Sequence, residues 1–519
     1  MRQQPRLSTL LDENIAGTGF EITFPRPPEC PGDDTWMTWS LHDVRGVVQT
    51  MARRIGMPSG HGTPVTALLL PEGIHIPIAA LAAVRMGRIP LLINPRLDEA
   101  SISHLLTASG ATEVIAIPER LSATAKRAVA NFGPSSIDGR LPSPSNLNTQ
   151  VPAPRAPDAP AALFHTSGTT GTPKMVMWSD RQAVSGAWRY AIDELPGTLR
   201  SFILAMPSSH TAGLAFFAMC VLAGIRAIML PLPDPENLVS ASKGFRPEGI
   251  GAFSATLTEL VAEEKQDELA DSLKLWINMG DTAHSKHVRL LVESPSRSPE
   301  FSFGDGLGSS EMGWGSFRHR IQQGDRPASR CIGKPAPGTR AQILSPDGTP
   351  LPNDTPGLLA VSSEHIAPAY WNNDVGYWKD RRGDYFITGD IAMRASDGNY
   401  FHLDRRTDVI DEDSGVYSLL LEEDIINTHD GVLDASVFRD NETKSVIAAL
   451  RFENSVGAES KKRIIESLYL TGPSAIGKYV EWKDARVTIG ATGKVRKYFS
   501  KATPLTGKDN RECTSQDIW

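Results

Sequence analysis

Residues 166–174 have the composition of a loop that binds phosphate. They read Thr166, Ser167, Gly168, Thr169, Thr170, Gly171, Thr172, Pro173 and Lys174. Glycines let backbone amides converge on an anion, hydroxyl groups add hydrogen-bond donors, and a lysine supplies a mobile positive charge. The loop contains no Gly-Lys-Ser or Gly-Lys-Thr sequence, so it is not a Walker A loop. Loops of this composition are also common as flexible turns, and composition alone leaves both interpretations open.

The same nine residues resemble the signature loop of the adenylate-forming superfamily. This superfamily includes acyl-CoA synthetases, the adenylation domains of peptide synthetases and firefly luciferase. The pattern Thr-Ser-Gly-Thr-Thr-Gly-x-Pro-Lys is matched, although Met175 replaces the glycine that usually follows the lysine. The resemblance implies that the loop holds the β- and γ-phosphates of ATP while a carboxylic acid attacks the α-phosphate.

A second motif ends in a glutamate that could bind a metal ion. Residues 303–311 resemble the superfamily segment that ends in Gly-x-Thr-Glu, and they include Asp305, Gly306, Leu307, Gly308, Ser309, Ser310 and Glu311. The resemblance implies that Glu311 coordinates Mg²⁺, a cation that prefers oxygen ligands and bridges phosphate oxygens, and that the residues before it contact the nucleotide. Leu307 stands where an aromatic ring is frequent. A surface turn is the alternative, whereas a dinucleotide-binding fingerprint is excluded by the spacing of the glycines.

Three shorter segments complete the nucleotide site that the resemblance implies. Gly280 and Asp281 follow a predicted strand and are similar to the segment beside the adenine. The sequence Thr-Gly-Asp, ending at Asp390, is similar to the motif whose aspartate accepts hydrogen bonds from both ribose hydroxyls, and Arg405 matches an arginine that also reaches the ribose. Residues 493–496 resemble the region of the catalytic lysine, so Lys494 would neutralise charge as the transition state forms. Taken alone, the Thr-Gly-Asp segment and Lys494 would be read as parts of ordinary turns.

The site for the acid is expected in residues 205–213. This stretch resembles the superfamily segment beside the acid pocket, where His210 would line or gate the carboxylate site next to Thr211 and Gly213. A histidine whose hydrogen bonds are satisfied in the core is the alternative. The stretch has no aspartate of the kind that pairs with a substrate ammonium group in amino-acid-activating domains. An acid without an α-ammonium group is therefore expected, but its length and ring content are not predicted.

The resemblance implies an acyl-CoA ligase with ATP, Mg²⁺ and CoA as cofactors or co-substrates. The acid and ATP would give acyl-AMP and pyrophosphate, and CoA would then displace AMP. Thr407 stands at the hinge position where the superfamily usually has aspartate. This departure leaves other acceptors open, namely the thiol of an acyl-carrier protein or an amine, and a non-catalytic nucleotide-binding role is a further alternative. A luciferase-like oxygenase has no specific support, because fold does not determine function.

The elements that would position these residues follow an α/β pattern. Between residues 36 and 117, amphipathic segments at 41–55 and 76–86 alternate with apolar runs at 65–70 and 89–93. This alternation predicts mostly parallel sheets covered by helices. Residues 132–161 are expected to form a long surface connection, and further strands are expected at 201–206, 225–230 and 273–278.

We expect two domains from the length of 519 residues. The first, residues 1–404, would be a large multi-subdomain N-terminal domain that binds ATP and the acid. The second, residues 405–519, would be a small, mobile α+β C-terminal domain that carries Lys494, with helices near 419–428 and 460–470 and strands near 435–438 and 446–452.

Composition and charge favour a soluble cytoplasmic protein. Hydrophobic residues make up 40% and charged residues 22%, and the net charge of −7 argues against a nucleic-acid partner. The four cysteines, which suit a reducing compartment, are Cys30, Cys220, Cys331 and Cys513. The apolar run at 214–230 is expected to be a buried helix followed by a strand rather than a membrane span. The oligomeric state is not predicted.

Overall fold

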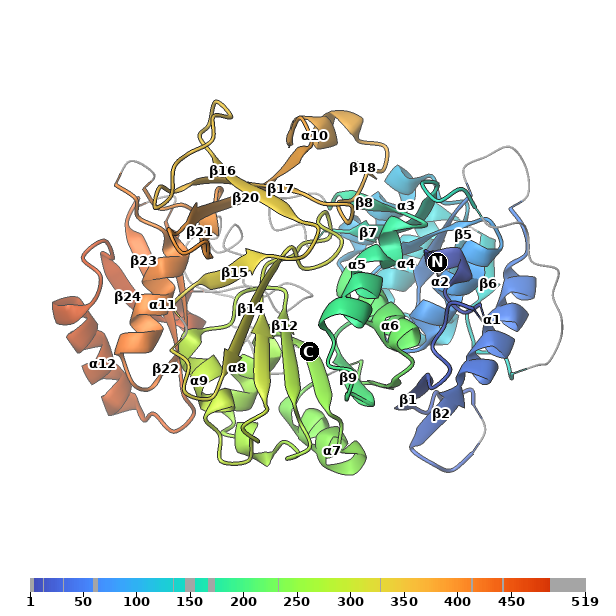
Figure 1. The fold of residues 1–519 in the computed structure, drawn as a ribbon, viewed down its shortest axis with the longest axis horizontal. Helices are drawn as coiled ribbons and strands as arrows, with labels where there is room; N and C mark the ends of the chain where they lie inside the picture. Colours follow the sequence, from blue (N-terminus) through green and yellow to red (C-terminus); the bar gives the residue numbers. More distant parts are fainter. Residues whose placement is uncertain are drawn as a thin grey trace.

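The computed structural model describes residues 4–485 except 13, 31, 59–63, 134, 145–154, 167–172, 232, 327, 412–413 and 441–442. Within these ranges the strands form three sheets, with helices packed between and around them (Figure 1). Residues 167–172 of the predicted phosphate loop and Lys494 lie outside the described residues.

The first sheet has the strand order β18-β8-β7-β4-β3-β5-β6. Its strands are β3 (Val65–Leu69), β4 (Ile89–Leu92), β5 (Glu113–Ala116), β6 (Ser135–Asp138), β7 (Pro160–His165), β8 (Met175–Ser179) and β18 (Ala369–Tyr370). The strands from β3 to β7 pair in parallel, and β8 and β18 continue the sheet antiparallel. The α-helices that accompany it are α1 (Leu41–Ile55), α2 (His75–Arg85), α3 (Glu99–Ser109) and α4 (Ala123–Phe132).

Local sequence explains why α1 begins where it does. The side chain of Ser40 accepts a hydrogen bond from the backbone amide of Asp43, and the Asp43 carboxylate accepts one from the backbone amide of Ser40. This reciprocal capping satisfies two amides that have no partner in the first turn of a helix. The apolar face of α1, which includes Val44, Val47 and Met51, is fully buried.

The predicted surface connection at 132–161 is partly wrong, because it contains strand β6. This strand lies at the edge of the sheet, pairs with β5 in parallel and leaves three of its four residues exposed. Only Ile137 is apolar, so neither an apolar run nor an alternating pattern marks the strand in the sequence.

The second sheet combines a parallel half and an antiparallel half. Its order is β16-β17-β20-β21-β15-β14-β13-β12-β11-β9-β10-β1-β2, with β19 paired to β20. The parallel half consists of β1 (Glu21–Pro25), β9 (Ser201–Ala205), β10 (Arg226–Met229), β11 (Gly249–Phe253), β12 (Leu275–Met279) and β13 (Ser302–Asp305), and β2 (Trp36–Ser40) closes its edge antiparallel to β1. The strands predicted at 201–206, 225–230 and 273–278 are therefore confirmed.

The antiparallel half was not predicted. It consists of β14 (Phe317–Gln322), β15 (Cys331–Pro335), β16 (Arg340–Leu344), β17 (Gly357–Ser362), β19 (Arg381–Arg382), β20 (Tyr385–Arg394) and β21 (Tyr400–Arg405). Its strands β16, β17 and β20 lie above the parallel half in Figure 1. Its strands bring residues near 390 and 405 close to the ends of β12 and β13.

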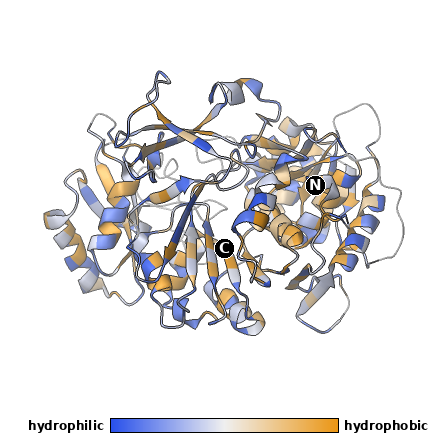
Figure 2. Ribbon diagram, in the orientation of Figure 1, coloured by the Kyte–Doolittle hydropathy of each residue, from blue (hydrophilic) through white to orange (hydrophobic). Residues whose placement is uncertain are grey.

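The helices of the middle part are α5 (Gln182–Arg189), α6 (Thr211–Ala223), α7 (Pro235–Phe245), α8 (Ser254–Ala262), α9 (Ser285–Val292) and α10 (Asp374–Trp378). As predicted, the apolar run at 214–230 is a buried helix, α6, followed by strand β10. Hydrophobic residues gather around α6 and the strands beside it, whereas the outer helix α12 is largely polar (Figure 2). No helix in the described ranges is long and apolar enough to cross a membrane.

A third sheet, β22-β23-β24, forms the C-terminal part of the described chain. It contains β22 (Val432–Arg439), β23 (Val446–Phe452) and β24 (Lys478–Glu481), accompanied by α11 (Ser418–Thr428) and α12 (Ala458–Thr471). These elements share a hydrophobic cluster of their own, which includes Ile425, Val437 and Leu450. The predicted α+β character of this region is confirmed, and the boundary at residues 404 and 405 stays a prediction.

Buried charges join the C-terminal part to α8 and α9. Glu423 of α11 accepts hydrogen bonds from the backbone amide of Ser285, at 2.8 Å, and from Nδ1 of His284, at 2.9 Å. Asp434 lies 3.3 Å from Nε2 of His284, and Arg451 pairs with Glu259. Burial opposes the charged form of His284, but the two carboxylates outweigh burial and raise its pKa to about 10. Glu423 therefore caps the N-terminus of a helix in another part of the chain.

Candidate active site

Strand ends of the second sheet meet around a cavity of about 810 Å³. The carboxyl ends of parallel strands are where open α/β sheets bind ligands, because the connections there diverge. The sequence-predicted residues that line the cavity are Thr166, Lys174, His210, Thr211, Gly280, Asp281, Asp305, Gly306, Leu307, Gly308, Ser309, Ser310, Glu311 and Arg405. The structure thus brings most of the predicted residues together, although Thr166 and Arg405 are 239 positions apart in the sequence.

Asp390 lies just behind the cavity wall, in a cluster of charges. Its carboxylate is fully buried, 3.0 Å from Nε of Arg405 and 3.3 Å from Nε2 of His402. Burial opposes ionisation of Asp390, but Arg405 and His402 outweigh burial and hold its pKa at about 2. The carboxylate is therefore ionised at neutral pH, as acceptance of two hydroxyl hydrogen bonds would require.

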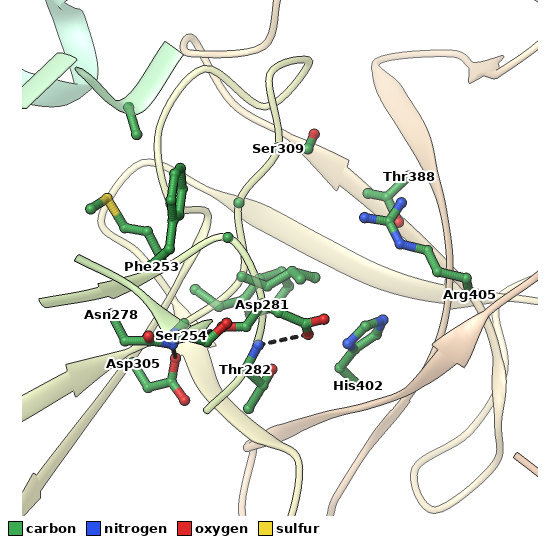
Figure 3. Close-up of a pocket in the computed structure, with 18 of the residues that line it drawn as sticks. Phe253, Ser254, Asn278, Asp281, Thr282, Asp305, Ser309, Thr388, His402 and Arg405 are labelled. Carbon is green, nitrogen blue, oxygen red and sulfur yellow. Dashed lines mark hydrogen bonds between the residues drawn. The ribbon is translucent and has the colours of Figure 1, made fainter. Parts of the chain in front are cut away.

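A buried arginine links this cluster to Asp281. One terminal nitrogen of Arg330, Nη2, lies 3.2 Å from the Asp281 carboxylate and 3.2 Å from Nδ1 of His402. Asp281 also accepts a hydrogen bond from the backbone amide of Thr282, at 2.8 Å. Figure 3 shows Asp281 and Thr282 between Asp305 on one side and His402 on the other. The polar wall is thus continuous from the end of β12 to β21.

Asp305 occupies the other side of this wall, at the end of β13. Its carboxylate accepts hydrogen bonds from Nδ2 of Asn278, at 2.9 Å, and from the backbone amides of Gly306 and Ala283. Burial raises the pKa of Asp305 to about 6, and these donors only partly oppose the rise. Gly306 has no room for a side chain, because a Cβ atom there would lie 2.2 Å from the carbonyl oxygen of Phe317.

Replacement of Asp305 by asparagine is expected to remove a pH-dependent loss of stability. The carboxyl of Asp305 has a folded pKa of about 6 against an ordinary 3.8, so its stability contribution is complete below pH 4 and is lost as pH rises through 6. The amide does not ionise, although it gives up one acceptor oxygen, so the free energy of unfolding of the variant relative to the wild type should rise by about 3 kcal/mol between pH 4 and pH 7. Denaturant unfolding at pH 4 and pH 7 measures it, with the exposed Asp325→Asn as the control. A difference that does not rise with pH would contradict the assignment.

Lys174 and Glu311 both contact Tyr370. The hydroxyl of Tyr370 donates a 2.9 Å hydrogen bond to Oε1 of Glu311, and Nζ of Lys174 lies 4.8 Å from the centre of the Tyr370 ring. Thr166 and Lys174 face each other across the predicted phosphate loop, since each backbone amide donates to the other residue. Burial, together with the nearby Glu311 carboxylate, raises the pKa of Tyr370 above its usual range, so the hydroxyl remains a donor.

The carboxylate of Glu311 suits a magnesium ion that is bound to ATP. Among the described residues, no group of three or more His, Cys, Asp or Glu side chains could hold a metal ion. Mg²⁺ usually takes one or two carboxylates and obtains its other ligands from phosphates and water, whereas structural zinc needs several side chains. The donor set therefore fits Mg²⁺ with ATP and does not fit a metal held by the protein alone.

His210 directly precedes α6 and caps its N-terminus. Nδ1 of His210 accepts a hydrogen bond of 3.1 Å from the backbone amide of Ala212. A neutral ring whose Nδ1 accepts has its proton on Nε2, as donation to a carboxylate would require. Phe253 meets the imidazole edge to face at 5.1 Å. Gly213 does not line the cavity; a Cβ atom there would lie 2.5 Å from the carbonyl oxygen of Pro207.

Glu72 holds the loop that carries His210. It follows β3, in the first sheet, and its carboxylate accepts hydrogen bonds from both the backbone amide and the hydroxyl of Ser209. Burial raises the pKa of the Glu72 carboxyl, and the donors on Ser209 oppose that rise. A contact between the two sheets therefore fixes the start of α6.

An aromatic wall borders the cavity on the side of α6. The rings of Phe216 and Trp314 stack with centroids 4.8 Å apart, and Tyr190 lies 5.6 Å from Trp314. Tyr190 opens a π-helical turn, Tyr190–Glu194, that extends α5; such turns are frequent at functional sites. Trp314 packs closely against α5, because a Cβ atom built at Gly186 would lie 2.4 Å from the Cβ atom of Trp314.

The family model described as AMP-binding enzyme matches residues 26–371, more than half of the chain, and the chain belongs to this adenylate-forming family. The 3-aminoavenalumate diazotase of a Streptomyces species is 28% identical over 496 residues, which cover 88% of each chain. The 4-hydroxybenzoate–CoA/benzoate–CoA ligase of Rhodopseudomonas palustris is 26% identical over 536 residues, which cover 97% of this chain and 94% of that one.

Solved structures show the same fold. The anthranilate CoA ligase AuaEII, in complex with anthranoyl-AMP, has a TM-score of 0.80 at 17% identity and is covered over 98% of its length, with 97% of this chain. The expected α/β fold is thereby confirmed.

Sequence reasoning missed several residues of the site: Glu72, Tyr190, Phe216, Trp314, Arg330, Tyr370 and His402. A signal for one of them existed. Phe216 lies four positions after Ala212 on α6 and therefore on the same face of the helix. His402 lies between Phe401 and Leu403 in strand β21, and this alternation alone would place its side chain on the exposed face, so it gave no signal.

Proposed function

We propose that the protein activates an aromatic carboxylic acid as its acyl adenylate and passes the acyl group to CoA. The observation that carries this proposal is the aromatic wall of Tyr190, Phe216 and Trp314, which borders the same cavity as His210 and the polar nucleotide wall. Flat rings suit a planar aryl group, which gains from offset or edge-on ring contacts. The names of relatives that act on benzoate and 4-hydroxybenzoate support the same substrate class.

Each part of the cavity has a role in the proposed reaction. Asp390, with Arg405, would bind the ribose, and Lys174 would approach the phosphates. Glu311 would hold Mg²⁺, which when bound withdraws charge from the phosphate oxygens. His210 would orient the acid, and Lys494, outside the described residues, remains the predicted catalytic lysine.

A second candidate function is the diazotisation of an aryl amine, favoured by the similarity to a diazotase over most of the chain. Here ATP would adenylate nitrite instead of a carboxylic acid. The amine nitrogen would bond to the nitroso nitrogen as the bond to AMP oxygen breaks, giving an N-nitrosoamine and AMP. Proton transfer and loss of water would then leave the diazonium ion.

Exchange of labelled pyrophosphate into ATP tests both candidates. We expect exchange that depends on one or a few benzoic or cinnamic acids, followed by a CoA thioester, identified by mass spectrometry, when CoA is added. Exchange driven by nitrite, with a diazonium product from an aminoaryl acid, would favour the second candidate. Exchange followed by transfer only to a carrier-protein thiol or an amine would replace CoA as the acceptor. No exchange with any acid or with nitrite would contradict both candidates.

A further inference from the structure

Tyr370 is fixed by the backbone to both sides of the predicted phosphate site. Strand β18 pairs with β8, with Tyr370 opposite Val176, and the amide of Trp371 donates to the carbonyl of Met175 at 2.8 Å. Met175 directly follows Lys174 in the sequence. The position of the Tyr370 ring is thus tied to the strand that begins after Lys174.

The segment before Tyr370 is tied in turn to the backbone of Glu311. The amide of Ala367 donates a hydrogen bond of 2.7 Å to the carbonyl oxygen of Glu311. The hydroxyl of Tyr377 donates to the carbonyl of Ala367 at 2.5 Å, and its ring meets that of Tyr370 edge to face at 5.6 Å. The main chain of Glu311 and the hydroxyl that contacts its side chain therefore belong to one rigid unit.

These contacts restrict the carboxylate of Glu311. A carboxylate on a flexible side chain can turn about its last bonds, and a metal ion must stop that motion when it binds. The hydrogen bond from Tyr370 to Oε1 restricts that rotation before a metal ion binds, and it leaves the other lone pairs of the carboxylate available. Residues that orient a metal ligand in this way typically change affinity or activity by about tenfold to a hundredfold when they are replaced.

We infer that Tyr370 is a positioning residue for the magnesium complex of ATP: its hydroxyl orients Glu311 while its ring face supports the ammonium group of Lys174. The ring contact is a cation–π interaction, which holds the ammonium beside the metal site without neutralising its charge. One side chain thereby sets the separation of the two groups that meet the phosphates. This inference rests on the proposed binding of ATP with Mg²⁺.

The test compares Tyr370→Phe with Tyr377→Phe in the full-length protein. The first variant removes the hydrogen bond to Glu311 and keeps the ring beneath Lys174. The second removes a hydroxyl of the same kind from the neighbouring ring, where it donates to the main-chain carbonyl of Ala367. Calorimetric titration with ATP, in the presence and absence of Mg²⁺ and without an acid, measures binding independently of activity, and thermal unfolding confirms that both variants are folded.

We expect Tyr370→Phe to bind ATP without Mg²⁺ as tightly as the wild-type protein does. The factor by which Mg²⁺ raises the affinity for ATP should be at least about tenfold smaller in this variant than in the wild-type protein. Tyr377→Phe should keep that gain, whatever it loses in stability. A full magnesium gain in Tyr370→Phe, or an equal loss in both variants, would overturn the positioning role. Absence of a magnesium gain in the wild-type protein would overturn the proposed ATP site, and the role of Tyr370 with it.

Discussion

Asp390→Asn is expected to weaken ATP binding by about 100-fold, because hydrogen bonds to a charged acceptor contribute about 1.5–3 kcal/mol each. The amide has one acceptor oxygen and one donor group, so it cannot accept from two ribose hydroxyls as a carboxylate can. It also leaves Arg405 and His402 without their buried counter-charge. Titration with ATP measures the loss, and Asp397→Asn, an exposed change in the turn between β20 and β21, should bind ATP normally.

The same variant separates binding from stability through its pH dependence. The folded pKa of Asp390 is about 2 against an ordinary 3.8, so its contribution to stability is complete above pH 4 and is lost as pH falls towards 2. Asp390→Asn should therefore lower the free energy of unfolding by about 2 kcal/mol at neutral pH, and by less at pH 3. Denaturant unfolding at both pH values measures the difference. A variant that binds ATP with wild-type affinity would remove Asp390 from the nucleotide site.

Trp314→Ala is expected to change which acids the protein activates. Trp314 is 8% exposed and forms the wall beside Phe216 and Tyr190, so its removal deepens the cavity by the volume of an indole ring. Small aryl acids should lose the ring contact while bicyclic or extended acids gain space. Because one methylene group in an apolar pocket already changes transition-state binding by about 1–3 kcal/mol, we expect the preference to shift by about 100-fold or more.

An assay of pyrophosphate release gives kcat/KM for a benzoate and for a two-ring acid, and the ratio of the two values measures that shift. The control is Trp378→Ala, which removes an exposed indole that does not line the cavity. If the ratio is the same in both variants, Trp314 does not border the acid. A uniform fall for all acids would point instead to a damaged fold, which thermal unfolding would reveal.

Motif residues at strand ends could be predicted from the sequence. Gly280 and Asp281 follow an apolar run, so once such runs are read as parallel strands, these residues must lie at one edge of the sheet. The strands β9, β10 and β12 were predictable for the same reason, whereas β1, β11 and β13, which ends at Asp305, were not predicted. Lys174 and Glu311 needed the resemblance as well, because a single turn glutamate or lysine has no distinctive local pattern.

Residues that act through tertiary contact could not be predicted in this way. Tyr370 lies in a two-residue strand and reaches Glu311 across 59 positions of sequence, which no local periodicity reports. The antiparallel strands of the second sheet are partly polar and, apart from the ten-residue β20, short, so the pairing that brings Arg405 beside Asp390 becomes visible only in the assembled sheet. Trp314 shows the same limit, since its position depends on the absence of a side chain at Gly186.

Because Glu423 caps α9, amide hydrogen exchange at Ser285 tests whether the C-terminal part, which we predict to be mobile, separates from the rest. The backbone amide of Ser285 is protected by a carboxylate from α11 rather than by its own helix. Whenever the two parts separate, that amide loses its acceptor while the later turns of α9 keep theirs. The exchange rate of the Ser285 amide, compared with the rates of later amides in α9, would therefore report such a separation without a label or a ligand. Exchange reports the local opening of hydrogen bonds.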